Sequence, residues 1–331
     1  MISSFYNIKN LYVVKNMYRL GIDLGGTNIA AGVVDENYKI ISTASTKTLV
    51  PRPAEQIAED MAKVAFEVSQ KAGITLDDIG GFGIGTPGSV DMQTGTVIYA
   101  NNLGFYNVPL AEMMKERTGK QFFVANDADS AAYGEFIAGA GKGTNNFVMI
   151  TLGTGVGGGV IIDGKIRSGF NGAGGELGHT VIQMNGEACT CGRDGCFEAY
   201  ASATALIRQT KQAMIKNSSS IMWDICGNDL NRVNGLTAFD AMRKGDEAGK
   251  SVVDTYISYL SVGITNLINI FQPEVFCIGG GVSKEGDTII KPLERIVHSD
   301  NYARSIKKKT LIKAAQLGNN AGIIGAAFIS E

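Results

Sequence analysis

The sequence predicts an α/β protein with two domains. Its 331 residues are enough to bury two cores of ordinary size. Short apolar runs alternate with helical patterns along most of the chain, which is typical of α/β folds. Two Gly-rich segments with matching flanks occur far apart in the chain, and such a repeat indicates duplicated domains.

The charge balance and the apolar pattern exclude several classes of partner. Lys and Arg number 30 against 32 Asp and Glu, so no electrostatic argument supports binding to nucleic acid or to an anionic membrane. No apolar run approaches the roughly 18 residues of a membrane span, and the opening segment has only the short run LYVV where a signal peptide has a longer one. We therefore expect a cytoplasmic protein that acts on a small molecule.

The folded pattern is expected to begin at Met17. Residues 1–16 show no hydrophobic period and are interpreted as a disordered extension, so the first domain is expected to span residues 17–127. From Arg19 onward the chain has the pattern of a β-hairpin with a Gly-Gly turn.

The turn of this first hairpin is a candidate phosphate site. Backbone N–H groups of such a turn can hold phosphate oxygens, although Gly-Gly is also a common structural turn. Asp23 ends the first strand, where it either holds Mg²⁺ through water or supports the hairpin. The turn residues are Gly25, Gly26, Thr27 and Asn28.

A second hairpin is predicted from the repeat. Aligning the chain with itself brings Leu24 over Leu152, so ITLGTGVGGGVIID is a second copy of the first hairpin. Two such turns that face each other across a cleft could hold a polyphosphate from both sides. The alternative is a pair of unrelated hairpins, but turn chemistry alone does not require matching flanks. The second turn contains Gly153, Thr154 and Gly155.

Between the hairpins lie a packing helix and two turns. Apolar residues recur with a helical period from Pro53 to Lys71. A strand then leads to the turn TPG, which contains Gly88. A later strand ends at NNLG, where Asn101 and Asn102 are turn formers by default.

The strand QFFVAND runs directly into an Ala-rich helix. Asn126 and Asp127 therefore stand at the carboxyl end of a strand beside a helix N-terminus, where α/β folds place ligand chemistry. Both residue types are also preferred helix N-caps. The spacing alone leaves a capping role and a ligand role equally open.

His179, Cys189, Cys191 and Cys196 form a compact set that suits tetrahedral zinc. Four protein ligands leave no open position, so the metal would be structural. The alternative is that the cysteines are buried, reduced thiols, but TCGRDGC is polar and Gly-rich. Glu176 and Glu198 bracket the set without an expected role in it, which leaves them free to bind hydroxyls.

The second domain is expected to span residues 128–311, with the zinc segment at 176–198. A long helix is predicted from Asp246 to Phe271, because its apolar residues lie on one face. EVFCIGGGV is interpreted as a buried strand that ends in a turn, and a last helix is expected within residues 312–331. The turn after the strand would contain Gly279, Gly280 and Gly281.

Together these motifs resemble those of the ROK (repressor, open reading frame, kinase) family. The resemblance runs from about Met17 to the C-terminus and rests on DLGGTN, TPG, NDA, LGTGVGGG, GELGH, the three cysteines and IGGGV. The family includes bacterial glucokinases, N-acetylmannosamine kinases and sugar-responsive repressors. It implies the two-domain actin-like ATPase (ribonuclease H-like) fold, in which the last helix packs back on the first domain.

The resemblance also implies an activity and roles for individual residues. The activity is ATP-dependent phosphorylation of a hexose at its 6-hydroxyl, with MgATP as the donor and glucose as the expected sugar. Asp127 is then the catalytic base, the glycines of IGGGV lie on the adenosine side, and His179 turns its second ring nitrogen to the sugar. The implied sugar contacts are Gly88, Asn102, Asn126, Asp127, Glu176, His179 and Glu198.

Two alternatives share parts of this pattern. An N-acetylmannosamine kinase would have equally similar GELGH and cysteine segments. A sugar-responsive repressor would carry a helix-turn-helix before DLGGTN, and the segment that precedes Asp23 is too short for one and shows no basic recognition helix. The family resemblance further implies a homodimer or a higher homo-oligomer.

Overall fold

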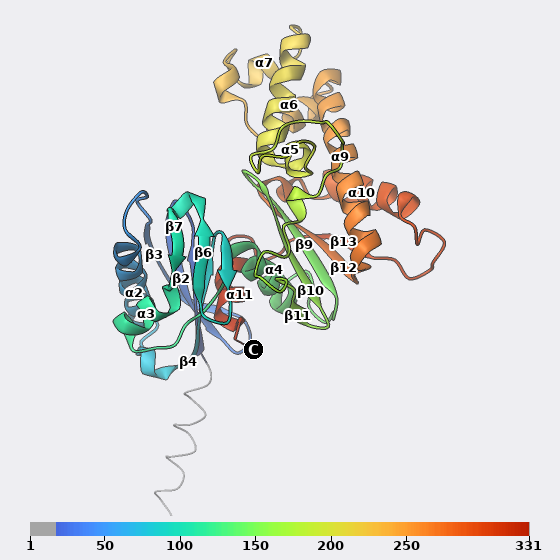
Figure 1. Cartoon of the computed structure of the whole chain (residues 1–331). Coiled ribbons are helices and arrows are strands. Elements are labelled where there is room, and N and C mark those ends of the chain that lie inside the picture. The colour runs from blue at the N-terminus through green and yellow to red at the C-terminus, as the bar shows by residue number, and fades with distance from the viewer. Residues whose placement is uncertain (1–17, 331) are drawn as a thin grey trace, which may run out of the picture.

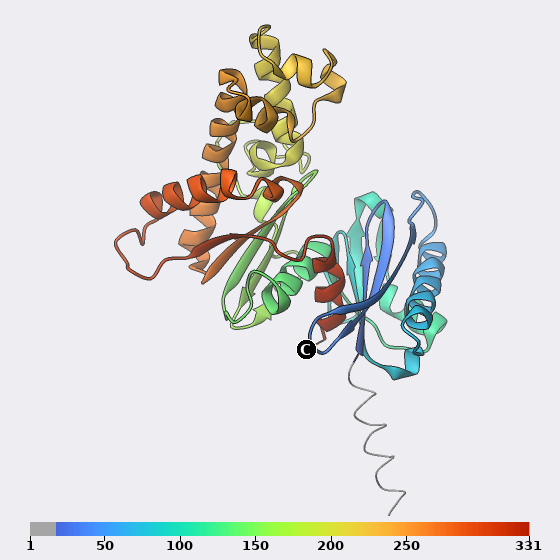
Figure 2. The ribbon, with the colours of Figure 1, turned by 180° about the vertical axis from the view of Figure 1, so that it is seen from behind.

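The computed structural model describes residues 18–330, and within them the chain forms two five-stranded sheets and one three-stranded sheet (Figure 1). The expected extension at residues 1–16, the start at Met17 and the last residue, Glu331, lie outside the described residues. Each five-stranded sheet belongs to one half of the molecule, and two helices lie between the halves (Figures 1 and 2).

The first sheet has the strand order β3-β2-β1-β4-β8. β1 and β2 form the predicted hairpin, β3 pairs antiparallel with β2, and β4 and β8 continue the sheet in parallel with β1. Leu20, Ile22 and Leu24 of β1 are fully buried, as is expected of the central strand of a sheet. The strands are β1 (Tyr18–Leu24), β2 (Asn28–Asp35), β3 (Ile40–Lys47), β4 (Ile79–Thr86) and β8 (Phe123–Asn126).

Helices α2 (Ala54–Lys71) and α3 (Leu110–Thr118) pack beside this sheet (Figure 1). The apolar positions that predicted α2 are buried. A small sheet of β5 (Ser89–Asp91), β6 (Thr96–Ala100) and β7 (Phe105–Val108) follows β4, and Asn101–Leu103 form a short 3₁₀ helix after β6.

The second sheet repeats the topology of the first. Its order is β11-β10-β9-β12-β13, with β9 antiparallel to β10 and parallel to β12. β9 and β10 form the hairpin that the sequence repeat matched to β1 and β2, so the predicted internal duplication is confirmed. The strands are β9 (Phe147–Leu152), β10 (Val156–Ile162), β11 (Lys165–Ile166), β12 (Val275–Gly280) and β13 (Leu311–Ala314).

Helices cover the second sheet and extend beyond it (Figure 1). α9 (Glu247–Phe271) begins where the sequence predicted, because the Asp246 side chain accepts a hydrogen bond from the Gly249 N–H at 2.6 Å. It ends at Gln272, whose φ of 43° is left-handed. The others are α5 (Glu198–Ala201), α6 (Ala203–Lys216), α7 (Met222–Ile225), α8 (Thr237–Arg243) and α10 (Asp287–Asp300). Across residues 18–330 no helix, α9 included, has the length and apolar composition that crossing a membrane requires.

The C-terminal region contains a strand as well as the helix predicted within residues 312–331. Leu311–Ala314 form strand β13, because their backbone pairs with β12 and Ile312 enters the core. The last helix, α11 (Asn320–Phe328), begins only after Gly318, whose φ of 56° ends the extended segment. The glycine turn also differs, because β12 continues through Gly279 and Gly280 and a short 3₁₀ helix begins at Gly281.

α4 (Asp127–Ala138) and α11 lie side by side between the two halves (Figures 1 and 2). Their backbones touch, because a Cβ on Gly134 would overlap the carbonyl of Ala321 and one on Gly325 would overlap that of Ser130. The fully buried Glu135 accepts hydrogen bonds from three backbone N–H groups, one after α4 and two before α11. The pair therefore forms one tightly joined unit.

Candidate active site

A large cleft opens at the carboxyl ends of the parallel strands. Its volume of about 720 Å³ lies within the range of small-molecule sites. The lining comes from the ends of β1, β8 and β12, the turn between β9 and β10, the N-terminal ends of α4 and α11, and the segment around the cysteine cluster. Of the residues predicted from the sequence, the cleft brings together Asp23, Gly88, Asn102, Asn126, Asp127, Gly153, Thr154, Gly155, Glu176, His179, Glu198 and Gly280.

Other predicted residues lie outside this lining. Gly279 is inside β12 and Gly281 begins the 3₁₀ helix after it. The first turn, residues 25–28, borders the cleft at Asn102, because a Cβ on Gly26 would stand 3.4 Å from the Asn102 Nδ2. The second turn thus contributes directly to the cleft wall, whereas the first stands next to it.

Asn126 and Asp127 have different tasks at the start of α4. The Asn126 side-chain oxygen accepts hydrogen bonds from the N–H groups of Ala128 and Asp129 at 2.8 and 3.2 Å, and its amide donates to the Gly88 carbonyl at 3.0 Å. Asn126 is therefore the N-cap. Asp127 is the first residue of the helix, its Oδ1 accepts from the Ala128 N–H at 2.8 Å, and it lines the cleft. The capping role that the sequence left open for both residues belongs to Asn126.

Two desolvated carboxylates, Asp23 and Asp127, lie at this end of the cleft. Burial, reinforced by the Asp127 carboxylate, raises the pKa of Asp23 to about 6. Burial also raises the pKa of Asp127, against the opposing effect of the Ala128 N–H. A desolvated carboxylate beside a second one is a donor set that fits a hard cation such as Mg²⁺, because the cation relieves both burial and repulsion.

Asp129 is a buried acid that the sequence analysis did not single out. It is 4% exposed, and among residues 18–330 nothing hydrogen-bonds to its Oδ1. Burial raises the pKa of Asp129 to about 7, and the Glu176 and Asp127 carboxylates add to this effect. Its ionisation therefore opposes folding at neutral pH.

Replacing Asp129 by Asn is expected to stabilise the protein increasingly as the pH rises. Because the folded pKa lies above that of the unfolded chain, the native protein loses stability as the pH rises from about 4 through 7, and Asn removes this loss. The gain in unfolding free energy should be larger at pH 8 than at pH 5 by on the order of a few kcal/mol. Urea denaturation at both pH values measures it, and a gain that is independent of pH would contradict the charge argument.

Glu198 connects the second turn to the cysteine loop. Its Oε2 accepts a hydrogen bond from the Val156 N–H at 2.9 Å, and its Oε1 accepts from the Thr190 hydroxyl at 3.2 Å and from the Cys189 thiol at 3.7 Å. The expectation that Glu198 is free is therefore wrong, because the N–H that follows the second turn needs an acceptor and Glu198 is beside it. A ligand hydroxyl that reaches Glu198 would share an oxygen that already has partners.

Other polar groups of the cleft wall come from separate loops. Gly88 has a φ of 96° and lies where a Cβ would overlap the Tyr99 carbonyl, so the wall has no side chain there. Asn102 is exposed on the 3₁₀ helix after β6. Glu176 is exposed immediately before the short 3₁₀ helix Leu177–His179, which carries His179 into the lining.

The four predicted metal ligands meet at one point. The ligand atoms of His179, Cys189, Cys191 and Cys196 all lie within 4.8 Å of one another. The Sγ atoms of Cys191 and Cys196 are 3.6 Å apart, and Cys189 Sγ is 3.6 Å from His179 Nδ1. Zinc–sulfur bonds of about 2.3 Å and zinc–nitrogen bonds of about 2.0 Å in a tetrahedron place such atoms roughly 3.5 to 3.8 Å apart. The spacing fits one zinc ion, with Nδ1 as the imidazole ligand.

The loop that presents these ligands is short and tightly turned. The Cys189 N–H donates to the Arg193 carbonyl at 2.8 Å, and Gly192 closes the turn with a φ of 88°. Burial and the neighbouring thiols raise the pKa of Cys196 to about 12 when no cation is present. A thiolate at Cys196 therefore needs a bound cation to be stable at neutral pH.

Sequence reasoning missed the N-terminal end of α11. Gly318, Asn319 and Gly322 line the cleft, and Gly322 lies against Asp23, where a Cβ would stand 3.0 Å from Oδ2. A helix N-terminus favours anions, because its first N–H groups are unpaired and its dipole is positive there. The signal was present as the segment GNNAG, which combines small residues with Asn where a helix begins.

The chain is similar to known proteins over nearly its whole length. The model of the ROK family matches residues 19–331. A glucokinase from Thermotoga maritima is 38% identical over 312 residues, which cover 94% of this chain and 96% of that protein. A solved ROK family glucokinase from Streptomyces griseus, in complex with glucose and AMPPNP, is 36% identical with a TM-score of 0.79, over 94% of this chain and 98% of that one. A candidate N-acetylmannosamine kinase from Listeria monocytogenes is 26% identical with a TM-score of 0.75, over 95% and 98% of the two chains.

The predicted fold is confirmed by these solved structures and by the duplicated sheets. The family match spans nearly all described residues, and the Thermotoga maritima relative is similar over almost its whole length. The chain therefore belongs to the ROK family and has its actin-like ATPase fold.

Proposed function

We propose that this protein transfers the γ-phosphoryl group of ATP to the 6-hydroxyl of glucose. The observation that carries the proposal is the position of Asp127, a desolvated carboxylate at the start of α4 that lines the same cleft as the second glycine turn and the predicted sugar contacts. Relatives that are glucokinases support ATP as the donor and glucose as the acceptor.

Asp127 acts as the general base in this proposal. The sugar 6-oxygen attacks the γ-phosphorus and forms the new P–O bond, while the bond from phosphorus to the β,γ-bridging oxygen breaks and ADP leaves. The hydroxyl proton passes to Asp127. Its raised pKa makes it a stronger base than a solvated aspartate, which favours this transfer.

The phosphates are held by backbone N–H groups and by the end of a helix. The second turn, residues 153–155, lines the cleft directly, and the N-terminal end of α11 adds a positive dipole. We assign the first turn, residues 25–28, and the glycines of β12 to the same nucleotide. Asp23 would hold Mg²⁺ through water, and the ion would neutralise the phosphate charge that develops during transfer.

Asn102, Glu176, His179 and Glu198 orient the sugar, and Gly88 leaves room for it. Polar groups from several loops that converge on one cleft can each accept from or donate to a different hydroxyl. Asn126 supports this set through the Gly88 carbonyl rather than as an open donor. The zinc ion would fix His179 by Nδ1 and leave Nε2 for a hydroxyl.

A panel of sugars tests the proposed function. We expect ADP release with glucose to have the highest kcat/KM among glucose, mannose, fructose, N-acetylglucosamine and N-acetylmannosamine, because glucose is the sugar of the relatives above. Higher kcat/KM with N-acetylmannosamine would favour the alternative kinase, for which the Listeria monocytogenes protein is the supporting comparison. If the protein binds a sugar but releases ADP with none of the five sugars, the proposed kinase activity is rejected.

The expected cellular location follows from the ATP and the reduced cysteines that the proposed function requires. ATP and reduced cysteine ligands are both found in the cytoplasm, which supports a cytoplasmic location. A homodimer stays a prediction of the family resemblance, and sedimentation analysis measures it.

A further inference from the structure

The first phosphate turn is fastened to the rest of its domain by Thr48. The Thr48 hydroxyl donates to the Gly25 carbonyl at 2.6 Å, and the Thr48 N–H donates to the Thr27 carbonyl at 3.0 Å. Thr48 is fully buried, so the donor side of both bonds is shielded from water, whereas Gly25 is half-buried and Thr27 is exposed. One residue, directly after β3, therefore holds both ends of the turn Gly25–Thr27.

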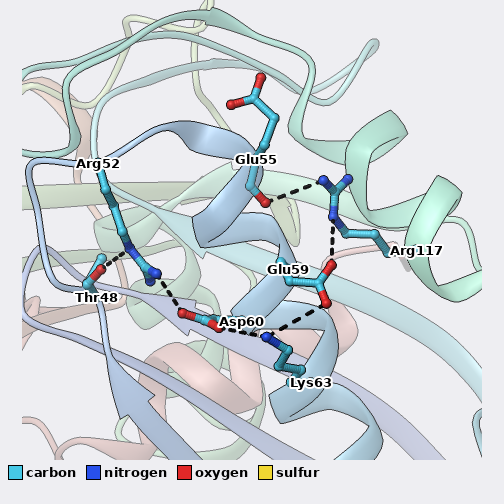
Figure 3. Close-up of polar contacts among 7 residues, drawn as sticks. All are labelled: Thr48, Arg52, Glu55, Glu59, Asp60, Lys63 and Arg117. Carbon is cyan, nitrogen blue, oxygen red and sulfur yellow. Dashed lines mark hydrogen bonds and ion pairs between the residues drawn. The ribbon is translucent and has the colours of Figure 1, made fainter.

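Arg52 in turn holds Thr48. Its Nε donates to the Thr48 carbonyl at 2.6 Å, and its Nη1 forms an ion pair with Asp60 Oδ2 at 2.7 Å (Figure 3). The two side chains are 14% and 25% exposed, which limits screening by water and favours a defined geometry. Asp60 lies on α2, so the helix serves as the fixed support of the arginine.

A second arginine of the same network does not reach Thr48. Arg117, on α3, donates to the Glu55 carbonyl and lies 3.6 Å from the Glu59 carboxylate (Figure 3). It also donates to the Met113 carbonyl. These partners all lie on α2 and α3, so Arg117 joins the two helices and not the segment that carries the turn. Arg117 is therefore a matched control for Arg52, because it joins the two helices without contacting Thr48.

We propose that Arg52 is a positioning residue for the nucleotide phosphates, which acts through Thr48 on the first phosphate turn. This inference rests on the proposed function, because it takes N–H groups of the first turn as ligands of the ATP phosphates. The Gly25 N–H is not one of them, since it donates to the Asn28 carbonyl at 2.9 Å. Backbone donors that are already fixed bind an anion without a further cost of ordering. Loss of the bond from Arg52 leaves the Thr48 carbonyl without its donor. The segment between β3 and Arg52 and the turn Gly25–Thr27 can then fluctuate together.

Steady-state kinetics separate this role from a general loss of stability. Arg52→Ala is expected to raise the KM for ATP about tenfold and to leave the KM for glucose within about twofold, because the sugar contacts lie on other loops. Arg52→Lys keeps the charge and one donor, and is expected to recover part of the ATP affinity. Arg117→Ala is expected to lower the Tm while the KM for ATP stays within about twofold. An ATP effect of equal size in Arg52→Ala and Arg117→Ala would overturn the proposal.

Hydrogen exchange of the protein without ligands tests the same inference independently of activity. The Thr48 N–H is bonded to the Thr27 carbonyl, so its exchange reports opening of the turn. We expect exchange in the segment 24–48 to be at least about tenfold faster in Arg52→Ala than in the wild type and unchanged in Arg117→Ala. If Arg52→Ala does not fold, Asp60→Asn is expected to show a smaller increase of the same kind. It removes the ion pairs of Asp60 with Arg52 and with Lys63 but leaves the bond from Arg52 to the Thr48 carbonyl.

The kinetic and exchange experiments distinguish a failure of the proposed function from a failure of the positioning role. Absence of ADP release by the wild type with every sugar would reject the proposed function but leave the exchange result to decide whether Arg52 fixes the turn. Normal ATP affinity and unchanged exchange in a folded Arg52→Ala variant would reject the positioning role while the kinase activity stands.

Discussion

Asp127→Asn is expected to yield a folded, zinc-containing protein whose kcat is at least about a hundredfold below that of the wild type. General-base assistance is typically worth about 10² to 10⁴ in rate, and an amide cannot accept the proton. The fold should tolerate the change, because the helix is capped by Asn126 and an amide oxygen at position 127 can still accept from the Ala128 N–H. Coupled ADP-release kinetics at saturating glucose and ATP measure the loss.

Asp129→Asn is the matched control for this substitution. It also converts an acid of α4 into an amide, two residues further along, but Asp129 does not line the cleft. Its pKa of about 7 means that it is substantially protonated near neutral pH, so an amide resembles its resting form. Turnover within about threefold of the wild type is expected. Near-normal turnover in Asp127→Asn would remove the catalytic assignment.

The pH dependence of kcat/KM gives an independent check on the same base. Burial raises the pKa of Asp127, so activity should decline toward acid at a higher pH than an ordinary aspartate would cause. Binding of a cation at Asp23 would lower the pKa of Asp127 again, because the cation adds positive charge beside both carboxylates.

Cys191→Ser is expected to lower the zinc content from one ion per chain to well below one, and to raise the KM for glucose at least about tenfold. Cys191 is exposed, so the smaller hydroxyl disturbs no packing and the change reports on the metal. Without the ion the loop loses the contact that holds His179 at the cleft. Changes that disturb how metal ligands are held typically cost about 10- to 100-fold in affinity or activity. Elemental analysis and glucose kinetics measure the two effects.

Cys226→Ser provides the control for the zinc experiment. Cys226 is buried in the core away from the cluster, with its thiol directed to the Trp223 carbonyl, and a serine there should lower stability without removing zinc. Treatment of the wild type with a chelator, followed by addition of zinc, should remove and then restore the affinity for glucose. Wild-type protein that contains no zinc after purification without a chelator would contradict the site.

Local patterns predicted most of the regular structure. The hairpins followed from apolar runs around glycine turns, and α9 followed from a single apolar face. The strand Leu311–Ala314 was not predicted, because the whole of α10 separates it in the sequence from its partner, β12. Pairing of that kind depends on the tertiary structure and is not visible in a local window.

The candidate site was predicted as a set of residues but not as a network. Its members could be named because most lie in short motifs. The partners of Glu198 could not, because they come from β10 and from the cysteine loop. Asp129 shows the same limit, since its burial depends on how α4 packs and not on its neighbours in the chain. The N-terminal end of α11 enters the cleft only because that helix packs against α4.

The contact between α4 and α11 affects which substitutions the protein can accept. Asp127 and the N-terminal end of α11 belong to helices whose backbones touch at Gly134 and Gly325, and Glu135 joins the chain that enters α11 to the end of α4. The proposed sugar contacts Asn102 and Glu176 lie on exposed loops outside this pair. Substitutions in those loops can therefore alter which hexose is accepted while the alignment of base and phosphate is retained. Selectivity can diverge among relatives of this chain without rebuilding the chemistry.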